Sequence, residues 1–136
     1  MRAFIRFNQG VLRSPLPVRL WLMLLVAANL GAPLFFLDNL EAQVVLACFV
    51  ASVALMTILT GLTGFTRLLS VGHIFWVPML FWLWNRLDQI PAQDAFGIWI
   101  RVLMTANLVS LLLDTVEVIR YIRGEREETV QGLPAQ

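Results

Sequence analysis

The stretch NLVSLLLDTVEVIRY, from Asn107 to Tyr121, places two carboxylates inside a segment that is otherwise apolar enough to cross a membrane. These carboxylates are Asp114 and Glu117. A charged side chain at the bilayer centre costs roughly 2.5–3.5 kcal/mol even on insertion-based scales, so such residues usually face a protein interior, a partner or water. We therefore expect a transmembrane helix with one polar side that avoids lipid.

The same apolar character recurs in three other segments. Of the 136 residues, 59% are hydrophobic and only 14% are charged. Backbone groups in lipid must hydrogen-bond internally, and segments of about 20 residues have the length of helical spans and not of barrel strands. We therefore predict an all-α integral membrane bundle over residues 18–122, preceded by residues 1–17 and followed by a short tail, residues 123–136, frayed from residue 129 onward. The expected spans are Val18–Leu37, Ala42–Phe65, Leu68–Leu87 and Phe96–Ile119.

The distribution of arginines predicts the topology. All ten basic residues are Arg, and most flank one side of the predicted bundle. By the positive-inside rule both termini are cytoplasmic, and the short loops and Arg-rich inner face are typical of a bacterial inner (plasma) membrane. Near the outer ends, we expect Arg86 and Arg101 to snorkel to the surface or to pair with Asp88 and Asp94. The inner-side arginines are Arg2, Arg6, Arg13, Arg19, Arg67, Arg120, Arg123 and Arg126.

Residues 1–17 have the pattern of a short amphipathic helix. At 3.6 residues per turn, Arg2, Arg6 and Arg13 fall within about 40° of one another, while apolar side chains occupy the other side. Such a helix lies in the headgroup region, where each Arg contributes roughly 1 kcal/mol with anionic lipid. We expect these three arginines to contact headgroups; the alternative is a disordered tail with chance patterning.

The fourth segment carries a polar stripe. Asn107, Ser110, Asp114, Glu117 and Tyr121 follow one another at steps of three and four, within roughly 80° of arc on an ideal helix. This stripe must face something other than lipid.

A second set of polar residues is expected at the same depth. Asp114 lies roughly 9 Å from the inner end of its helix, and His73 lies roughly 7–8 Å from the inner end of the preceding helix. We therefore predict one buried polar cluster in the cytoplasmic third of the membrane. Its expected members are His73, Asp114, Glu117, Arg67, Asn107 and Ser110, with the threonines at positions 57, 60 and 63.

This cluster supports two interpretations. A carboxylate beside a histidine in a low-dielectric site can bind and release a proton or hold a small cation. Alternatively, Arg67 or Arg120 with Glu117, and His73 with Asp114, form an internal salt-bridge network that locks helices together.

Two functional hypotheses follow. The first is a structural or accessory subunit that binds a larger membrane complex or itself, supported by small residues such as Ala27 and Gly31 at a spacing that permits close helix packing. The second is a small oligomeric proton-coupled transporter or ion channel that uses Asp114, Glu117 and His73.

Several other classes are disfavoured. A net charge of +1 gives no support for a nucleic-acid partner, and one Cys with one His cannot form a metal-ligand set. No HExxH, GxGxxG, P-loop or GxSxG motif occurs. We expect no metal, no cofactor and no enzymatic activity, and we expect the lipid bilayer to be the main environment.

Overall fold

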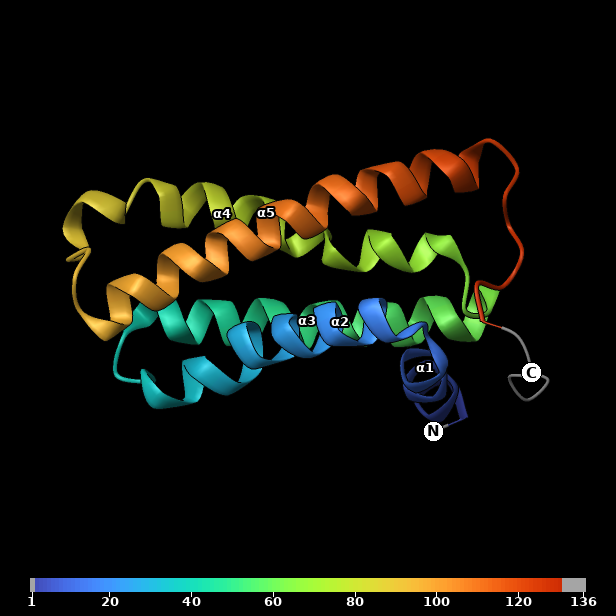
Figure 1. Cartoon of the computed structure of the whole chain (residues 1–136), viewed down its shortest axis with the longest axis horizontal. Helices are drawn as coiled ribbons and strands as arrows, with labels where there is room; N and C mark the ends of the chain where they lie inside the picture. Colours follow the sequence, from blue (N-terminus) through green and yellow to red (C-terminus); the bar gives the residue numbers. More distant parts are fainter. Residues whose placement is uncertain (1, 131–136) are drawn as a thin grey trace.

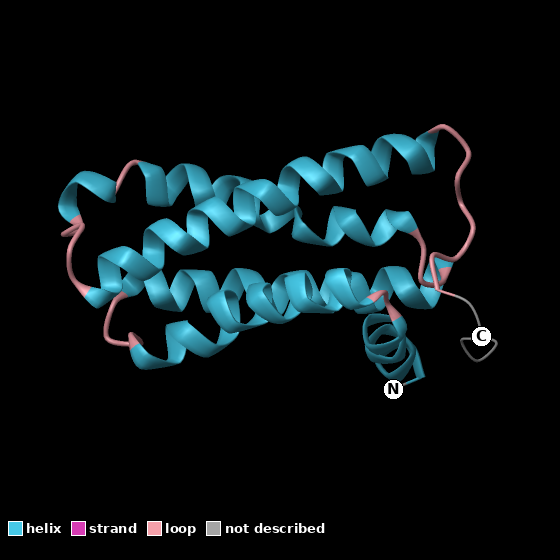
Figure 2. Ribbon diagram, in the orientation of Figure 1, coloured by secondary structure: helices cyan, strands magenta, loops and turns pink. Residues whose placement is uncertain are grey.

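The computed structural model describes residues 2–130, and within that range it consists of helices joined by short loops, without strands (Figure 1, Figure 2). Among these residues, four helical segments are long and apolar enough to cross a membrane. The prediction of four such helices is therefore confirmed, and each boundary lies within three residues of its expected position. The four segments are Leu16–Phe35, Leu40–Thr63, Arg67–Trp84 and Ala95–Ile122.

The elements follow one another as an up-and-down bundle. Residues 2–13 and 123–130 lie at the same end of the long axis (Figure 1), which we call the terminal end; the other is the loop end. That the terminal end faces the cytoplasm stays a prediction. The elements are α1 (Arg2–Arg13), α2 (Leu16–Val26), η1 (Ala27–Gly31), η2 (Ala32–Phe35), α3 (Leu40–Thr63), η3 (Arg67–Phe75), α4 (Trp76–Trp84), η4 (Leu87–Gln89) and α5 (Ala95–Ile122).

The main core occupies the middle of the bundle and its loop end. It combines large side chains from α4 and α5 with small ones that let the helix backbones approach closely. Ala28 and Ala42 are buried here, whereas a Cβ added at Gly31 would meet nothing within 4 Å. In the first span, Ala28 thus packs against other helices, whereas Gly31 faces away from them. The largest fully buried core side chains are Trp76, Leu83, Ile100, Leu103 and Val45.

The first span changes its helical winding twice in the residues around Pro33. The α-helix becomes a π-helix over Ala27–Gly31 and a 3-10 helix over Ala32–Phe35. Pro33 has no N–H, so the Ala28 carbonyl lacks its donor five residues ahead in π-helical register. The indole Nε1 of Trp99 donates to that carbonyl instead, at 2.9 Å. A side chain from α5 therefore replaces the missing backbone donor, as transmembrane prolines require.

The third span begins as a 3-10 helix of nine residues, η3, and continues as α4. A 3-10 helix rises about 2.0 Å per residue against about 1.5 Å in an α-helix, and runs longer than about four residues are uncommon. The 18 residues of this span therefore reach roughly 31 Å, enough for a hydrocarbon core of roughly 30 Å, where an all-α span would reach roughly 27 Å.

The buried positions of the third span follow this winding. In η3 they are spaced by three, at Leu69 and Gly72, because side chains three apart eclipse in a 3-10 helix. A Cβ added at Gly72 would lie 2.3 Å from Cγ of Met56, so a glycine is needed where η3 approaches α3. In α4 the spacing returns to three and four, at Trp76, Met79 and Leu83.

A second, smaller core closes the terminal end. The helix α1 lies across the long axis of the bundle (Figure 1) and contacts α3. The rings of Phe7 and Phe65 lie 6.2 Å apart between centroids, and Gly10 packs directly on Phe65, where a Cβ would lie 2.3 Å from the ring. Met56, Leu69 and Val130 complete this core.

The tail folds back onto the loop after α3. The backbone N–H and hydroxyl of Thr129 donate to the Phe65 carbonyl at 3.0 and 3.1 Å, and Glu128 accepts from the Phe65 N–H at 3.1 Å and pairs with Arg6. The expectation of a frayed tail is therefore wrong for residues 129 and 130, because a loop beyond a helix end offers free backbone groups. Residues 131–136 lie outside the described residues.

The Trp99 contact predicts the effect of one substitution. Trp99→Phe keeps a ring that can stack on Phe36 but leaves the Ala28 carbonyl without its indole donor. We expect it to lower the free energy of unfolding by about 1 kcal/mol, measured by SDS titration in mixed micelles. Trp84→Phe, at an exposed position, is the matched control. In a Pro33→Ala background, which restores a backbone N–H, the cost of Trp99→Phe should fall; an unchanged cost would contradict this account.

Candidate functional site

The structure divides the predicted polar cluster into three separate groups. Asn107 and Ser110 contact the first span, Asp114 contacts His73, and Glu117 contacts Arg67. The stripe on α5 is continuous, but the helix crosses different neighbours along its length. Side chains on one face therefore meet α2 and η1 toward the middle and η3 nearer the terminal end.

The first group is a pair of carboxamides. Asn29 in η1 and Asn107 in α5 are fully buried, and each Nδ2 donates to the other Oδ1 at 2.8 Å. Asn29 also donates to the Leu25 carbonyl at 3.0 Å, and one turn further along α5, Ser110 accepts from Trp21 Nε1 at 3.0 Å. Sequence reasoning missed Asn29 as a site residue. The available signal was a lone carboxamide in the middle of an apolar span.

The second group is a histidine–carboxylate pair. Nδ1 of His73 lies 2.7 Å from Oδ2 of Asp114, and the two side chains are 14% and 17% exposed. The imidazole also stacks on Trp76, with ring centroids 4.0 Å apart. Trp76 is 1% exposed, and its indole nitrogen has no hydrogen-bond partner among the described residues. One face of the imidazole is thus covered by a core aromatic ring.

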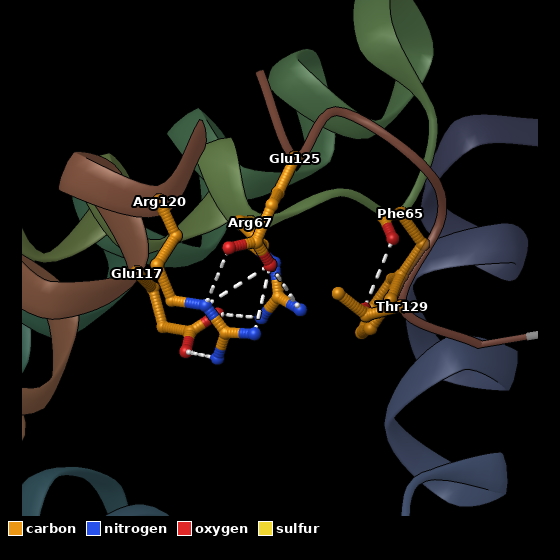
Figure 3. A network of polar contacts seen from close by, with 6 residues as sticks. All are labelled: Phe65, Arg67, Glu117, Arg120, Glu125 and Thr129. Atoms are coloured by element: carbon orange, nitrogen blue, oxygen red, sulfur yellow. Dashed lines mark hydrogen bonds and ion pairs between the residues drawn. The ribbon is translucent and has the colours of Figure 1, made fainter. Parts of the chain in front are cut away.

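The third group is a network of two arginines and two glutamates at the terminal end (Figure 3). Arg67 pairs with Glu117 and, at 3.2 Å, with Glu125; Arg120 pairs with Glu117 at 3.3 Å and with Glu125 at 2.8 Å. These side chains are 22% to 48% exposed. The network therefore sits at the rim of the bundle, where it ties η3 to the end of α5.

The 3-10 winding of η3 decides which residues can form these groups. Arg67 and His73 are six residues apart, which is two full turns at three residues per turn, so they share one face. In an α-helix the same separation would place them about 120° apart. On α5, Asp114 and Glu117 are neighbours on one face. The winding therefore lets one face of η3 meet both carboxylates.

The threonines near the end of α3 hydrogen-bond to their own helix. Thr57, Thr60 and Thr63 donate to the carbonyls four residues earlier, at 2.8 to 3.0 Å. Among the described residues, neither Thr57 nor Thr63 hydrogen-bonds to His73 or Asp114. In lipid, such back-bonding satisfies a hydroxyl within the helix, and the Thr63 hydroxyl also lies 3.4 Å from that of Thr66.

At the loop end, Arg86 and Arg101 bind other partners than those expected. Nε of Arg86 donates to Oε1 of Glu41 at 2.7 Å, not to Asp88, and its guanidinium lies 5.0 Å from the Trp82 ring centroid. Arg101 donates to two backbone carbonyls. Asp94, the expected partner of Arg101, instead caps α5 by accepting from the Gly97 N–H at 2.6 Å. Of the two expected alternatives, pairing with Asp88 and Asp94 is therefore not observed among residues 2–130, and the reach of Arg86 and Arg101 to the surface stays a prediction.

The three arginines of α1 are not equivalent. Arg2 and Arg13 are exposed, whereas the Arg6 side chain is 13% exposed and pairs with Glu128. The apolar side chains Phe4, Ile5 and Leu12 point away from the bundle and are 49% to 68% exposed. The helix therefore presents apolar groups with flanking cations to its surroundings, and uses Arg6 to bind the tail. Contact of Arg2, Arg6 and Arg13 with lipid headgroups stays a prediction.

The chemistry available at these groups is that of ion pairing and proton exchange. Among residues 2–130, no set of three His, Cys, Asp or Glu side chains is placed to hold a metal ion. Outside the spans, the hydrogen bond from Arg120 holds the pKa of Glu125 below its usual range, and partial desolvation opposes this effect.

Comparisons with protein-family models, with curated proteins and with solved structures find no match to this chain.

The carboxamide pair predicts non-additive substitutions. Asn29→Leu or Asn107→Leu alone leaves one buried amide without its partner, and should lower the free energy of unfolding by about 1–2 kcal/mol. The double variant should cost less than the sum of the two, since no lone amide is left. SDS unfolding of the four proteins checks this, with Asn8→Leu on the exposed side of α1 as control. Strict additivity would count against the pairing.

The Arg120–Glu125 contact predicts a pH dependence. Because the pKa of Glu125 is depressed in the folded protein, the stabilisation from this contact is present above the ordinary glutamate pKa. It is lost as pH falls through the depressed value. Carboxyl NMR of Glu125 in micelles should report a pKa below the usual range, and Arg120→Gln should raise it toward that range while Arg67 still pairs with Glu125; an unchanged titration in Arg120→Gln would refute the assignment.

Proposed function

We propose that this chain is a structural or accessory subunit, a small multi-pass protein that stabilises a larger membrane complex or an assembly of its own copies. One observation carries the proposal. All three carboxylates within the spanning segments have a basic partner inside the chain: Glu41 with Arg86, Asp114 with His73, and Glu117 with Arg67 and Arg120.

Such pairing supports a structural use of the charges. Buried or half-buried ions that are matched inside the chain fix which helix faces meet, and removing one partner leaves an uncompensated charge. A transport site must instead release its ion in each cycle, which internal arginine partners oppose. The contribution to stability is modest, about 0.6 kcal/mol on average for polar contacts between membrane helices. The contribution to a unique helix arrangement is the more important one.

The same proposal covers the surroundings of the bundle. We propose a bacterial inner membrane with both termini cytoplasmic, which the arginine bias supports. The apolar outer side of α1, flanked by Arg2 and Arg13, supports an interfacial helix at the cytoplasmic leaflet. The charged tail, residues 123–128, is exposed and offers polar side chains to a partner protein.

A second candidate is a small oligomeric proton-coupled transporter or channel that uses Asp114, Glu117 and His73. The specific observation in its favour is that Asp114 is paired with a histidine and not with an arginine. A histidine is the side chain that ordinarily changes charge near neutral pH, so this pair can exchange a proton where an arginine pair cannot.

Asp114→Asn separates the two candidates. For an accessory subunit, we expect a lower thermal midpoint in detergent, because His73 loses its charged partner, and no change in proton flux. Proteoliposomes with an internal pH dye and an imposed gradient should lose that gradient no faster than protein-free liposomes, for the wild type and for Asp114→Asn alike. Thr115→Ala, next to Asp114 and exposed, is the matched control.

The opposite result is equally specific. The structural role would be overturned if the wild-type protein dissipated the gradient, Asp114→Asn abolished this loss, and Thr115→Ala left it intact.

Native mass spectrometry of the protein purified with its copurifying partners supplies the second measurement. Recovery within a larger complex supports the accessory role, and an oligomer without other proteins that also conducts protons supports the transporter.

A further inference from the structure

A groove between α2 and α5 combines apolar walls with the guanidinium of one arginine, Arg101. It is apolar, measures about 410 Å³, and runs along α5 from Arg101 past Thr105 to Val109, with Trp21 and Leu24 of α2 as its other wall. Leu24, Thr105 and Val109 are exposed, so the groove is open to the surroundings of the bundle. In a spanning segment those surroundings are lipid.

Arg101 stands at the end of this groove nearest the loop end. Its Nη1 donates to the Gly97 carbonyl at 3.1 Å and its Nη2 to the Ile90 carbonyl at 3.2 Å. Ile90 precedes the first residue of α5, Ala95, so the guanidinium of Arg101 reaches out of the span toward the interface. Two of the five guanidinium N–H groups are used in these contacts, and the others are free to bind an anion.

The charge of Arg101 is not matched within the described chain. Among residues 2–130, the ion pairs engage Arg6, Arg67, Arg86 and Arg120, and none includes Arg101. The cost of a cation in a spanning segment falls when its side chain reaches the interface, and it falls further when an anion pairs with it there. The missing anion is therefore expected from outside the chain.

We propose that this groove binds one phospholipid, with its phosphate on Arg101 and an acyl chain along α2 and α5. The guanidinium has the planar fork of donors that matches a phosphate. Thr105 and Val109 lie about 6 and 12 Å deeper along α5 than Arg101. A headgroup at the interface and a chain descending toward the bilayer centre fit this order. The inference is independent of the proposed function.

Native mass spectrometry with added lipid tests the proposal. The protein is delipidated in detergent and titrated with phosphatidylglycerol, and the lipid retained per chain is measured. We expect one tightly held lipid in the wild type. Arg101→Gln should weaken its retention about tenfold, the effect of losing one charge-assisted contact. Arg126→Gln, whose guanidinium lies over the Tyr121 ring, removes a cation elsewhere and should change nothing.

Two further experiments separate the contribution of the groove to lipid retention from that of the charge. Thr105→Phe fills the groove while keeping Arg101, and should also release the lipid, whereas Val116→Phe at an exposed position of the same helix should not. Diacylglycerol with the same acyl chains lacks the phosphate and should not be retained. Circular dichroism confirms that each variant is folded.

Three outcomes would overturn the proposal. They are equal retention of phosphatidylglycerol in Arg101→Gln, Thr105→Phe and the wild type, retention of diacylglycerol as strong as that of phosphatidylglycerol, and a dimer in place of the lipid adduct. The first means that lipid surrounds the protein without a defined site. The second removes the role of the phosphate, and the third means that a second copy of the chain covers the groove.

Discussion

Hydrocarbon offers no hydrogen bonds, and this constraint accounts for most of the specific contacts in the bundle. A polar group placed inside a span costs several kcal/mol unless it finds a hydrogen-bond partner. The Ala28 carbonyl left free by Pro33 receives the indole of Trp99, Asn29 receives Asn107, and Asp114 receives His73. Each of these contacts joins two different spans, so satisfying the constraint also fixes which helices are neighbours.

The same constraint makes irregular backbone useful. The π-helix of the first span carries Asn29 to its partner, and the 3-10 helix of the third span aligns Arg67 with His73. Departures from α-helical winding in membrane spans often coincide with functional positions. Here they coincide with the three polar groups that hold α5 to its neighbours. In this bundle, the irregular helical segments therefore position the polar pairs.

The terminal end follows a different principle. There α1, the loop after α3 and the tail meet around Phe65, and the ion pair of Arg6 with Glu128 and the Thr129 backbone bond hold them together. These elements lie outside the spans, where water competes for polar contacts, so apolar packing of Phe7, Phe65 and Val130 contributes most. Partners that bind the proposed subunit at this end would meet a folded surface.

Three features could be predicted from the residues alone: four apolar segments of spanning length, a polar stripe on the last one, and similar depths for His73 and Asp114. These follow from composition and from fixed rises per residue, which need no knowledge of neighbours. Other pairings became visible only in the folded bundle: Asn107 with Asn29, Ser110 with Trp21, Arg86 with Glu41, and Arg6 with Glu128. Helix crossing and 3-10 winding set these pairs, and both depend on packing between spans, which a periodicity of 3.6 residues does not contain.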